Sequence, residues 1–294
     1  MTRYIDEHRG SFGVEPICRT LAVAPSTYYA AKTRPPSARH GSDATLADVM
    51  ARIHRENFGV YGVRKMWKAL HRAGIEAGRD QVARVMGLVG LEGATRTKRI
   101  RTTRPATVGE RPADLVERVF AAPAPNRLWV ADLTYVWTAR GFCYAAFIVD
   151  AFSKAIVGWR VTASLHTALA LDALEMAVFA RGPGLEGLVH HSDRGVQYLS
   201  LRYTERLAEA EAVSSVGSRG DSYDNALAET VNGLYKAELI HRHRPWRTVE
   251  QVELATARWV HWWNTARLHE GCGYVPPAEF EAAYHQRHAT TEAA

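Results

Sequence analysis

The feature that most constrains the fold is a stretch from residue 128 in which apolar residues recur with the period of a β-strand. The segments Leu128–Trp137, Phe142–Asp150 and Ala155–Val161 are separated only by short turns. Alternation of this kind predicts strands, and three strands with short links form an antiparallel meander. The first segment is mostly apolar on both faces, which indicates a central strand covered on both sides.

The pattern after this meander alternates between helix and strand. Periodicity of 3.6 residues predicts the helices, and short apolar runs bounded by turn residues predict the strands. The expected elements are a helix at 166–180, a strand at 187–192, a helix at 201–211, a strand at 212–218, helices at 223–240 and 249–265, and a last short helix near the C-terminus.

The first third of the chain is expected to be helical. A short helical pair is formed by "VEPICRTLAV" and "APSTYY", and "TRPPSARHGSD" then has the composition of a linker. Further on, two helical stripes flank the turn "RAGIEAG". Helix, glycine turn and helix in a basic segment are compatible with helix-turn-helix DNA binding. A plain three-helix bundle would give the same pattern.

Charge and cysteine content restrict the class of protein. The 294 residues carry a net charge of +6, and the pI of about 9.3 fits a polyanionic partner. Three distant cysteines without a C-x-x-C motif argue against a disulfide framework or structural zinc site, and for a reducing compartment. With no apolar N-terminal run and no long apolar stretch, we expect a soluble cytoplasmic protein that does not span a membrane.

A basic linker is expected between the helical segments and the strand-rich region. It contains a run without acidic residues that suits phosphate contacts if DNA passes nearby, although such runs are usually solvated linkers. The basic residues of this run are Arg96, Lys98, Arg99, Arg101 and Arg104. The expected division of the chain is 1–36, 43–92, 93–125 (the linker), 126–245 and 246–294.

Two aspartates stand where carboxylates are costly. Asp132 lies in the middle of the first, two-sided apolar strand, and Asp193 follows directly after the short strand at 187–192. A buried ionised carboxylate requires a charged partner or a metal, and ligand chemistry gathers where strands of an open sheet end. Asp150 is the rival acid, but an aspartate at a strand end commonly shapes a turn.

A third acid lies on the helix expected at 223–240. Glu229 falls in a polar row with Asn225, Asn232 and Lys236, opposite the apolar stripe of that helix. Taken alone, this row is what a solvated helix face looks like. Together, carboxylates from a strand, a strand end and a helix can converge on divalent metal, because Mg²⁺ prefers oxygen ligands, and two such ions can support phosphoryl transfer.

These residues carry a resemblance to a known family. The segments "LWVADLTYV", "HHSDRGVQY" and "SYDNALAETVNGLYKAEL" resemble the three signature segments of the DDE transposase and retroviral integrase superfamily. Between Asp193 and Glu229 lie 229 − 193 − 1 = 35 residues, as in integrases and one large bacterial insertion-sequence family. The similarity to that family spans nearly the whole chain. It also includes Lys236, "DAFSKAIVGW", "FGVYGVRKMWKAL" and the tail "NTARLHEGCGYVPPAEFEAAY".

The resemblance implies an α/β fold of the RNase H-like kind, with a five-stranded mixed sheet, flanking helices and helix-turn-helix-like segments before it. The 126–245 segment would be the catalytic core, and 246–294 would complete it. The resemblance implies Asp132, Asp193 and Glu229 as catalytic acids that bind Mg²⁺ or Mn²⁺, as two ions. Residues expected to contact DNA are Lys236, Asn225, Arg194 and the basic run Arg96, Lys98, Arg99 and Arg101.

The implied function is that of an insertion-sequence transposase. It would cleave DNA at the ends of the element and transfer the resulting 3′-OH to target DNA, in the bacterial cytoplasm near the nucleoid. A homo-oligomer in the DNA complex is expected, as is an upstream-frame helix-turn-helix and leucine-zipper partner or fusion. The alternatives are an RNase H-like nuclease without joining activity and a non-catalytic DNA-binding relative.

Overall fold

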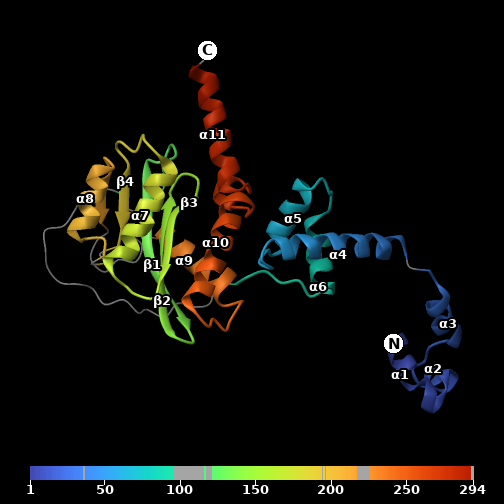
Figure 1. Cartoon of the computed structure of the whole chain (residues 1–294). Helices are drawn as coiled ribbons and strands as arrows, with labels where there is room; N and C mark the ends of the chain where they lie inside the picture. The colour runs from blue at the N-terminus through green and yellow to red at the C-terminus, as the bar shows by residue number, and fades with distance from the viewer. Residues whose placement is uncertain are drawn as a thin grey trace. The chain divides into compact units, whose positions relative to one another are not determined.

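The computed structural model of the chain describes residues 1–35, 37–95, 116, 121–193, 195, 197–216 and 226–292. The chain divides into two compact units, Met1–Val49 and Met50–Ala294. The second unit contains a five-stranded sheet with the strand order β3-β2-β1-β4-β5 (Figure 1). The strands are β1 (Leu128–Thr138), β2 (Gly141–Asp150), β3 (Ile156–Thr162), β4 (Val189–Ser192) and β5 (Val213–Val216).

The sheet is mixed. β1 pairs antiparallel with β2, and β2 antiparallel with β3, so the first three strands form the predicted meander. β4 runs parallel to β1, and β5 runs parallel to β4. This confirms the predicted RNase H-like mixed sheet, with β1 as its central strand. Parallel neighbours require crossover connections, and helices supply them.

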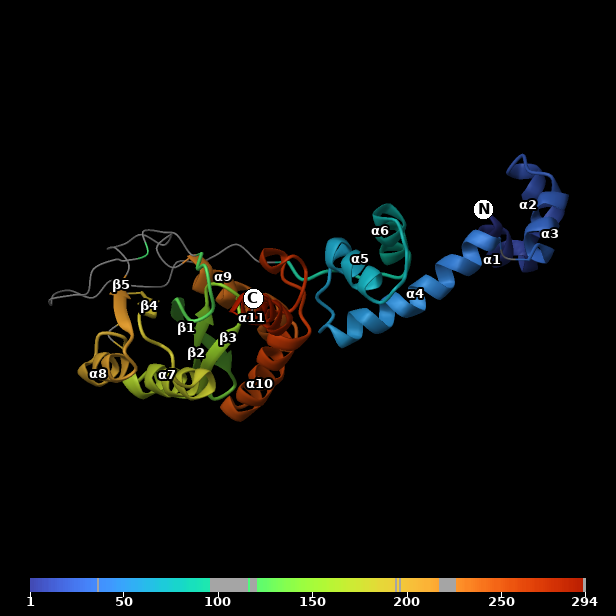
Figure 2. The same cartoon turned by 90° about the horizontal axis from the view of Figure 1, so that it is seen from above.

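Helices cover both faces of the sheet, as Figure 2 shows for α7 and α8 on one side and α9 on the other. On the first side, Trp129 and Ile148 belong to one buried core with Leu174 of α7 and Leu207 of α8. On the second side, the Phe147 ring packs edge-on against Tyr235 at 4.9 Å. These helices are α7 (Thr167–Arg181), α8 (Leu201–Glu209), α9 (Ala226–Tyr235), the π-helix η2 (Lys236–Ile240) and α10 (Val249–Thr265).

Gly158 explains how closely α7 approaches the sheet. A Cβ atom at this position of β3 would stand 2.1 Å from the Ala173 carbonyl oxygen and 2.9 Å from the Ala177 Cβ. Only glycine allows backbone and helix to meet at this distance. Small residues on both elements therefore set the height of α7 above β3.

The N-terminal unit contains one helix that the sequence pattern did not predict. α1 (Thr2–Phe12) precedes the expected pair α2 (Val14–Thr20) and α3 (Pro25–Thr33). Ile5 is its one buried residue, so α1 lacks the apolar stripe on which such predictions rest. Polar contacts compensate for this, since Asp6 accepts hydrogen bonds from Tyr28 at 2.7 Å and Lys32 at 2.6 Å.

Helix boundaries differ from expectation at two further places. α4 (Ala38–Glu56) begins inside the segment predicted as a linker, where the Ser37 hydroxyl accepts a hydrogen bond from the His40 amide at 3.2 Å and so caps the helix start. The last helix, α11 (Pro277–Glu292), has 16 residues and is not short. The predicted helices α5 (Val63–Arg72) and α6 (Arg79–Leu88) are present.

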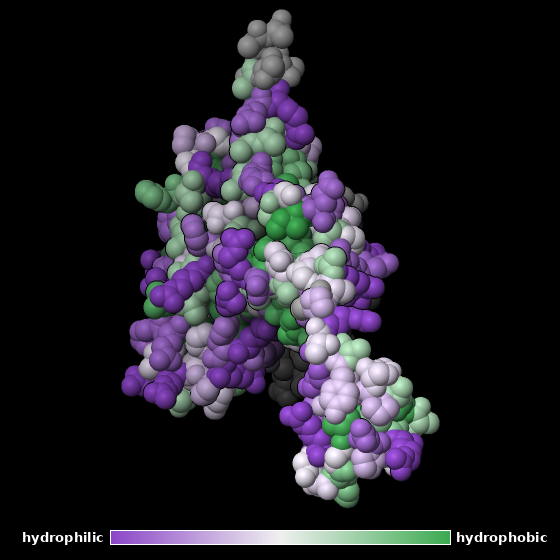
Figure 3. Space-filling model, turned by 90° about the vertical axis from the view of Figure 1, so that its right-hand side faces the viewer, coloured by the Kyte–Doolittle hydropathy of each residue, from purple (hydrophilic) through white to green (hydrophobic). Residues whose placement is uncertain are grey.

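Cys18, Cys143 and Cys272 are buried and free. Within the described ranges, no helix is both long enough and apolar enough to cross a membrane. Figure 3 shows hydrophilic side chains spread over one face of the molecule, with smaller apolar patches between them.

Candidate active site

The two aspartates are brought together by the register of β1 and β4. These strands are parallel, and their last paired residues are Ala131 and Ser192. Asp132 directly follows Ala131 along β1, and Asp193 directly follows Ser192 at the end of β4. Because neighbouring strands lie about 4.8 Å apart, this register makes the two acids neighbours at the end of the ladder.

Asp132 is held by hydrogen bonds to both carboxylate oxygens. The Leu133 amide donates to Oδ1 at 2.8 Å, and the Asn232 Nδ2 atom of α9 donates to Oδ2 at 2.9 Å. Asp132 as a whole residue is half-buried, and its carboxylate is the buried part. Side chains alternate along a strand, so Asp132 points to the α9 side while Ala131 points into the core under α7.

Glu229 joins this pair from α9. It precedes Asn232 by three residues, so the two side chains lie on one face of the helix, and Asn232 already contacts Asp132. The charge of Glu229 raises the pKa of both Asp132 and Asp193. Glu229 and Asn232 therefore face the aspartates and are not part of a solvated surface.

Burial and the repulsion of neighbouring charges dominate the electrostatics of the two aspartates. Burial raises the pKa of Asp132 to about 7, the charges of Asp193 and Glu229 act in the same direction, and the Leu133 and Asn232 hydrogen bonds oppose it. Burial also raises the pKa of Asp193, where the Gly195 amide opposes the shift. Like charges that cannot all ionise cheaply are a setting that a cation stabilises.

The surrounding atoms fit a hard cation. The buried Oδ1 of Asn232 and the buried hydroxyl of Tyr198 have no hydrogen-bond partner among the described residues, and both belong to residues beside the aspartates. Carboxylate and amide oxygens are what Mg²⁺ binds. Within the described ranges, no group of three or more acidic, histidine or cysteine side chains is arranged so that it could hold a metal ion.

Gly195 shapes the loop around Asp193. Its amide donates to the Asp193 Oδ1 atom at 2.9 Å. A Cβ atom on Gly195 would stand 2.9 Å from that same oxygen and 3.1 Å from the Gln197 Oε1 atom. The loop can fold over the carboxylate because position 195 carries no side chain.

The two histidines before Asp193 are used locally. His190 is hydrogen-bonded through Nε2 to the Tyr203 hydroxyl at 3.0 Å, and burial lowers its pKa to about 4. His191 is hydrogen-bonded through Nδ1 to the Ser215 hydroxyl at 2.9 Å. Both rings are buried, and these contacts order β4 and its neighbours.

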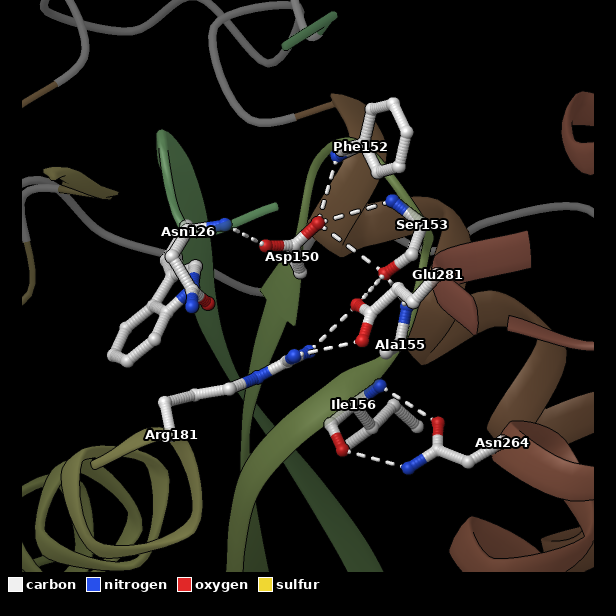
Figure 4. Close-up of polar contacts among 10 residues, drawn as sticks. Asn126, Asp150, Phe152, Ser153, Ala155, Ile156, Arg181, Asn264 and Glu281 are labelled. Carbon is white, nitrogen blue, oxygen red and sulfur yellow. Dashed lines mark hydrogen bonds and ion pairs between the residues drawn. The ribbon is translucent and has the colours of Figure 1, made fainter. Parts of the chain in front are cut away.

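Asp150 serves the turn after β2, as the sequence indicated. Its carboxylate accepts hydrogen bonds from the backbone amides of Asn126 at 2.7 Å, Phe152 at 2.9 Å and Ser153 at 3.0 Å (Figure 4). The Ser153 hydroxyl lies between this carboxylate and Glu281 of α11. These contacts occupy Asp150 and separate its role from that of the three acids.

Lys236 lies at the junction of α9 and η2. Its ammonium stands 4.4 Å from the centre of the Tyr135 ring. The π-helix that starts at Lys236 is anchored by a buried ion pair between Glu238 and Arg267, with a closest distance of 2.6 Å. A π-turn is often found at a functional site, and this one was not predicted.

Six of the predicted DNA-contact residues lie outside the residues that the structure describes. Of the predicted site residues, the structure therefore places only the three acids and Lys236. Asn232 and Tyr198 were not predicted to complete the site, although the three-residue spacing from Glu229 was a usable signal for Asn232. The six residues are Asn225, Arg194, Arg96, Lys98, Arg99 and Arg101.

Known families match most of the chain. Two families described as integrase core domain match residues 122–222 and 213–277, and one described as HTH-like domain matches residues 42–99. Among solved structures, the HTLV-2 integrase catalytic core domain in complex with magnesium has a TM-score of 0.42 and 17% identity. That alignment covers 54% of this chain and 98% of the other.

Relatives at higher identity come from insertion sequences. The protein of element IS986/IS6110 from Mycobacterium tuberculosis is 54% identical over 90% of this chain and 97% of its own length. The transposase for insertion sequence element IS629 from Shigella sonnei is 50% identical, with 97% of each chain covered. The chain therefore belongs to the family of insertion-sequence transposases with an integrase core domain.

Proposed function

We propose that this transposase cleaves DNA at the ends of its element and joins the freed ends to target DNA, with Asp132, Asp193 and Glu229 as its catalytic acids. The observation that carries the proposal is the register of β1 and β4, which makes Asp132 and Asp193 neighbours. Glu229 approaches the same point from α9 and raises the pKa of both.

The two proposed reactions are phosphoryl transfers. In cleavage, a water oxygen bonds to phosphorus, the phosphorus–O3′ bond breaks, and a free 3′-OH and a 5′-phosphate result. In joining, that 3′-oxygen bonds to a target phosphorus, loses its proton, and displaces the target's own 3′-oxygen. Neither step consumes an oxidant or an energy-rich cofactor, and neither uses a protein nucleophile.

Each residue has a distinct part in this scheme. Asp132, Asp193 and Glu229 would hold the divalent ions, Mg²⁺ or Mn²⁺ and two in number, which activate the attacking oxygen and stabilise the leaving one. Asn232 keeps the Asp132 carboxylate oriented through its 2.9 Å hydrogen bond. Lys236 binds the DNA end and supplies positive charge beside the scissile phosphate.

DNA binding is proposed to be shared along the chain. The α5–α6 pair lies in the segment that matches an HTH-like domain, and we propose that it binds the element ends. The basic run Arg96–Arg101, with Arg194 and Asn225, would contact phosphates. A homo-oligomer on DNA and an upstream-frame partner or fusion also belong to this proposal.

The test uses the ends of the element that encodes this chain. The purified full chain is incubated with a duplex end labelled on the transferred strand, with and without Mg²⁺. We expect a nicked product and a longer joined product that both require metal, and that Asp132→Asn, Asp193→Asn and Glu229→Gln each lack. Nicking without joining would indicate a nuclease, and DNA binding without nicking would indicate a non-catalytic relative.

A further inference from the structure

Four aromatic rings line one face of the β1–β2 hairpin. Trp137 is paired directly across the strands with Phe142, and Tyr135 with Tyr144, so all four project from the same face. The Tyr135 and Phe142 rings meet edge-on at 5.4 Å, as do Trp137 and Phe142 at 4.7 Å. We name this set, Tyr135, Trp137, Phe142 and Tyr144, the hairpin aromatic face.

The fold leaves most of this face exposed. Residues nearer the start of β1, such as Trp129 and Ala131, are covered on this side by α7, and Tyr144 packs at the edge of that core. Trp137 remains 63% exposed, Phe142 48% and Tyr135 39%. Neighbouring exposed rings form a contiguous apolar patch, and such a patch on a protein surface marks an interaction site.

Positive charge lies beside the rings. The Lys236 ammonium stands 4.4 Å from the centre of the Tyr135 ring, and the exposed Arg140 occupies the hairpin turn. Glu250 is an acid near Arg140. A hydrogen bond with Thr248 and, to a smaller extent, the charge of Arg140 lower the pKa of Glu250. Flat rings combined with cations match single-stranded nucleic acid, in which bases stack and phosphates carry negative charge.

The face is connected to the candidate active site. Tyr135 follows Asp132 by three residues on β1, about 10 Å along the strand. In the described residues, β4 pairs with β1 only over Leu128–Ala131. Lys236 comes from the α9 side and reaches the Tyr135 ring, which links the acids on one face of β1 to the rings on the other.

We propose that the hairpin aromatic face stacks on unpaired bases of the DNA strand that leaves the active site. The proposal rests on the proposed function for the identity of the DNA. It adds a separate binding site for single-stranded nucleic acid, with Trp137 and Phe142 as its outer stacking rings. The fully paired part of the duplex does not use this site.

The experiment compares two probes on the full-length chain. A fluorescent oligo-dT strand and a blunt duplex are titrated by anisotropy at one salt concentration. Trp137→Thr and Phe142→Thr keep strand propensity but remove a ring, and Phe179→Ala, which removes a 91% exposed ring of α7, is the matched control. We expect about tenfold weaker oligo-dT binding for the two hairpin variants, with duplex binding and the Phe179→Ala variant unchanged.

Tryptophan fluorescence gives an independent readout. All eight tryptophans lie in the described residues, and Trp137 is the exposed one. Trp137→Phe keeps a stacking ring, so it should bind oligo-dT nearly as well as wild type, yet lose the quenching of the exposed indole that oligo-dT causes. This comparison remains decisive if Trp137→Thr folds poorly.

Several outcomes would overturn the proposal. One is that folded Trp137→Thr binds oligo-dT with the affinity of the wild type. Another is that oligo-dT quenches the tryptophan fluorescence of wild type and Trp137→Phe equally. A third is that the oligomer mass changes in Trp137→Thr, which would mark a protein interface. Metal-dependent nicking of supercoiled plasmid by the wild type separates the two proposals. If the wild type nicks plasmid but the hairpin variants bind oligo-dT as well as wild type does, only the stacking site is rejected. If the hairpin variants selectively lose oligo-dT binding but the wild type does not nick plasmid, only the proposed function is rejected.

Discussion

The Nδ2 atom of Asn232 donates a hydrogen bond of 2.9 Å to Oδ2 of Asp132, and so joins α9 to the centre of β1. The other amide atom, Oδ1, is buried and has no partner in the described part of the chain. Asn232 is itself buried. The residue therefore fixes one carboxylate oxygen of Asp132 and offers an oxygen of its own to the same site.

Replacing Asn232 should impair the site without unfolding the protein. Removal of a residue that orients a metal ligand typically costs about 10–100-fold in metal affinity or activity. We expect Asn232→Ala to lower the rate of metal-dependent nicking by that order and to raise the Mg²⁺ concentration needed for half-maximal rate. Thr230→Ala, on the same helix, is the control. Wild-type Mg²⁺ dependence in Asn232→Ala would argue against this role.

The stability of the metal-free protein should fall as pH rises. The folded pKa of Asp132 is about 7, above its ordinary value of 3.8, and that of Asp193 is also raised. A carboxyl group with a raised folded pKa favours the folded state at low pH, and this advantage is lost as pH rises from about 4 through about 7. Between pH 5 and pH 8 we expect a loss of about 1–3 kcal/mol.

Urea unfolding in EDTA at the two pH values measures this loss. Asp132→Asn should remove much of the pH dependence and be more stable than wild type at pH 8, since it takes away a repelling charge. Mg²⁺ should restore stability to the wild type at pH 8 by binding the folded state. A wild-type stability that rises from pH 5 to pH 8 in EDTA would contradict the inferred repulsion.

Asp150 provides a contrast to the three acids. Its carboxylate accepts three backbone amides, so Asp150→Ala leaves buried donors without partners, at about 1–3 kcal/mol each. We expect a clearly lower thermal unfolding midpoint but metal-dependent nicking at low temperature. Asp132→Asn should show the reverse, with a stable fold and no nicking. Loss of nicking in an Asp150→Ala protein that remains folded would make Asp150 a candidate catalytic acid.

Lys236 should matter for DNA ends and not for metal. Its position at the start of η2, beside Tyr135, suits a cation that contacts DNA near the acids. Lys236→Ala should weaken binding to the element end and lower joining, with the Mg²⁺ dependence of residual nicking unchanged. Lys236→Arg should recover part of both activities, because charge is kept while geometry differs. Equal binding and joining in Lys236→Ala and wild type would remove Lys236 from the site.

The sequence predicts individual helices and strands well, but it predicts the contacts between them poorly. Strands β1 to β3 could be predicted because alternation is a local property, and Asp132 was conspicuous because it interrupts an apolar strand. The adjacency of Asp132 and Asp193 depends on the pairing of Ala131 with Ser192, which resemblance to a family could suggest but periodicity could not.

Elements that distant partners stabilise escaped prediction. α1 depends on Asp6, which is bound by Tyr28 and Lys32. In η2, the buried Glu238 pairs with Arg267, 29 residues further along the chain. Neither α1 nor η2 has a local hydrophobic period that would reveal it in the sequence. The contacts that stabilise each of them come from residues elsewhere in the chain.

An ion pair joins α11 to α7 beside the sheet. Arg181, at the end of α7, donates to both carboxylate oxygens of Glu281 on α11, each at 2.7 Å (Figure 4). Both side chains are largely buried, with 16% and 14% exposed. Burial alone would raise the pKa of Glu281. The hydrogen bonds and charge of Arg181, together with the Ser153 hydroxyl, outweigh burial and lower that pKa.

Removing one partner of this pair should lower the free energy of unfolding more than replacing both partners by apolar residues. Glu281→Leu leaves the Arg181 guanidinium buried without its partner, for which we expect a loss of about 3–5 kcal/mol in the free energy of unfolding. The double variant Arg181→Met/Glu281→Leu removes both charges and should recover much of that loss. Urea unfolding of the wild type, Arg181→Met, Glu281→Leu and the double variant gives the coupling energy. Glu279→Leu, which removes an exposed partner of Arg72, is the control and should change stability by about 0–1 kcal/mol. If the single and double variants lose the same stability, the pair does not fix α11 to the core.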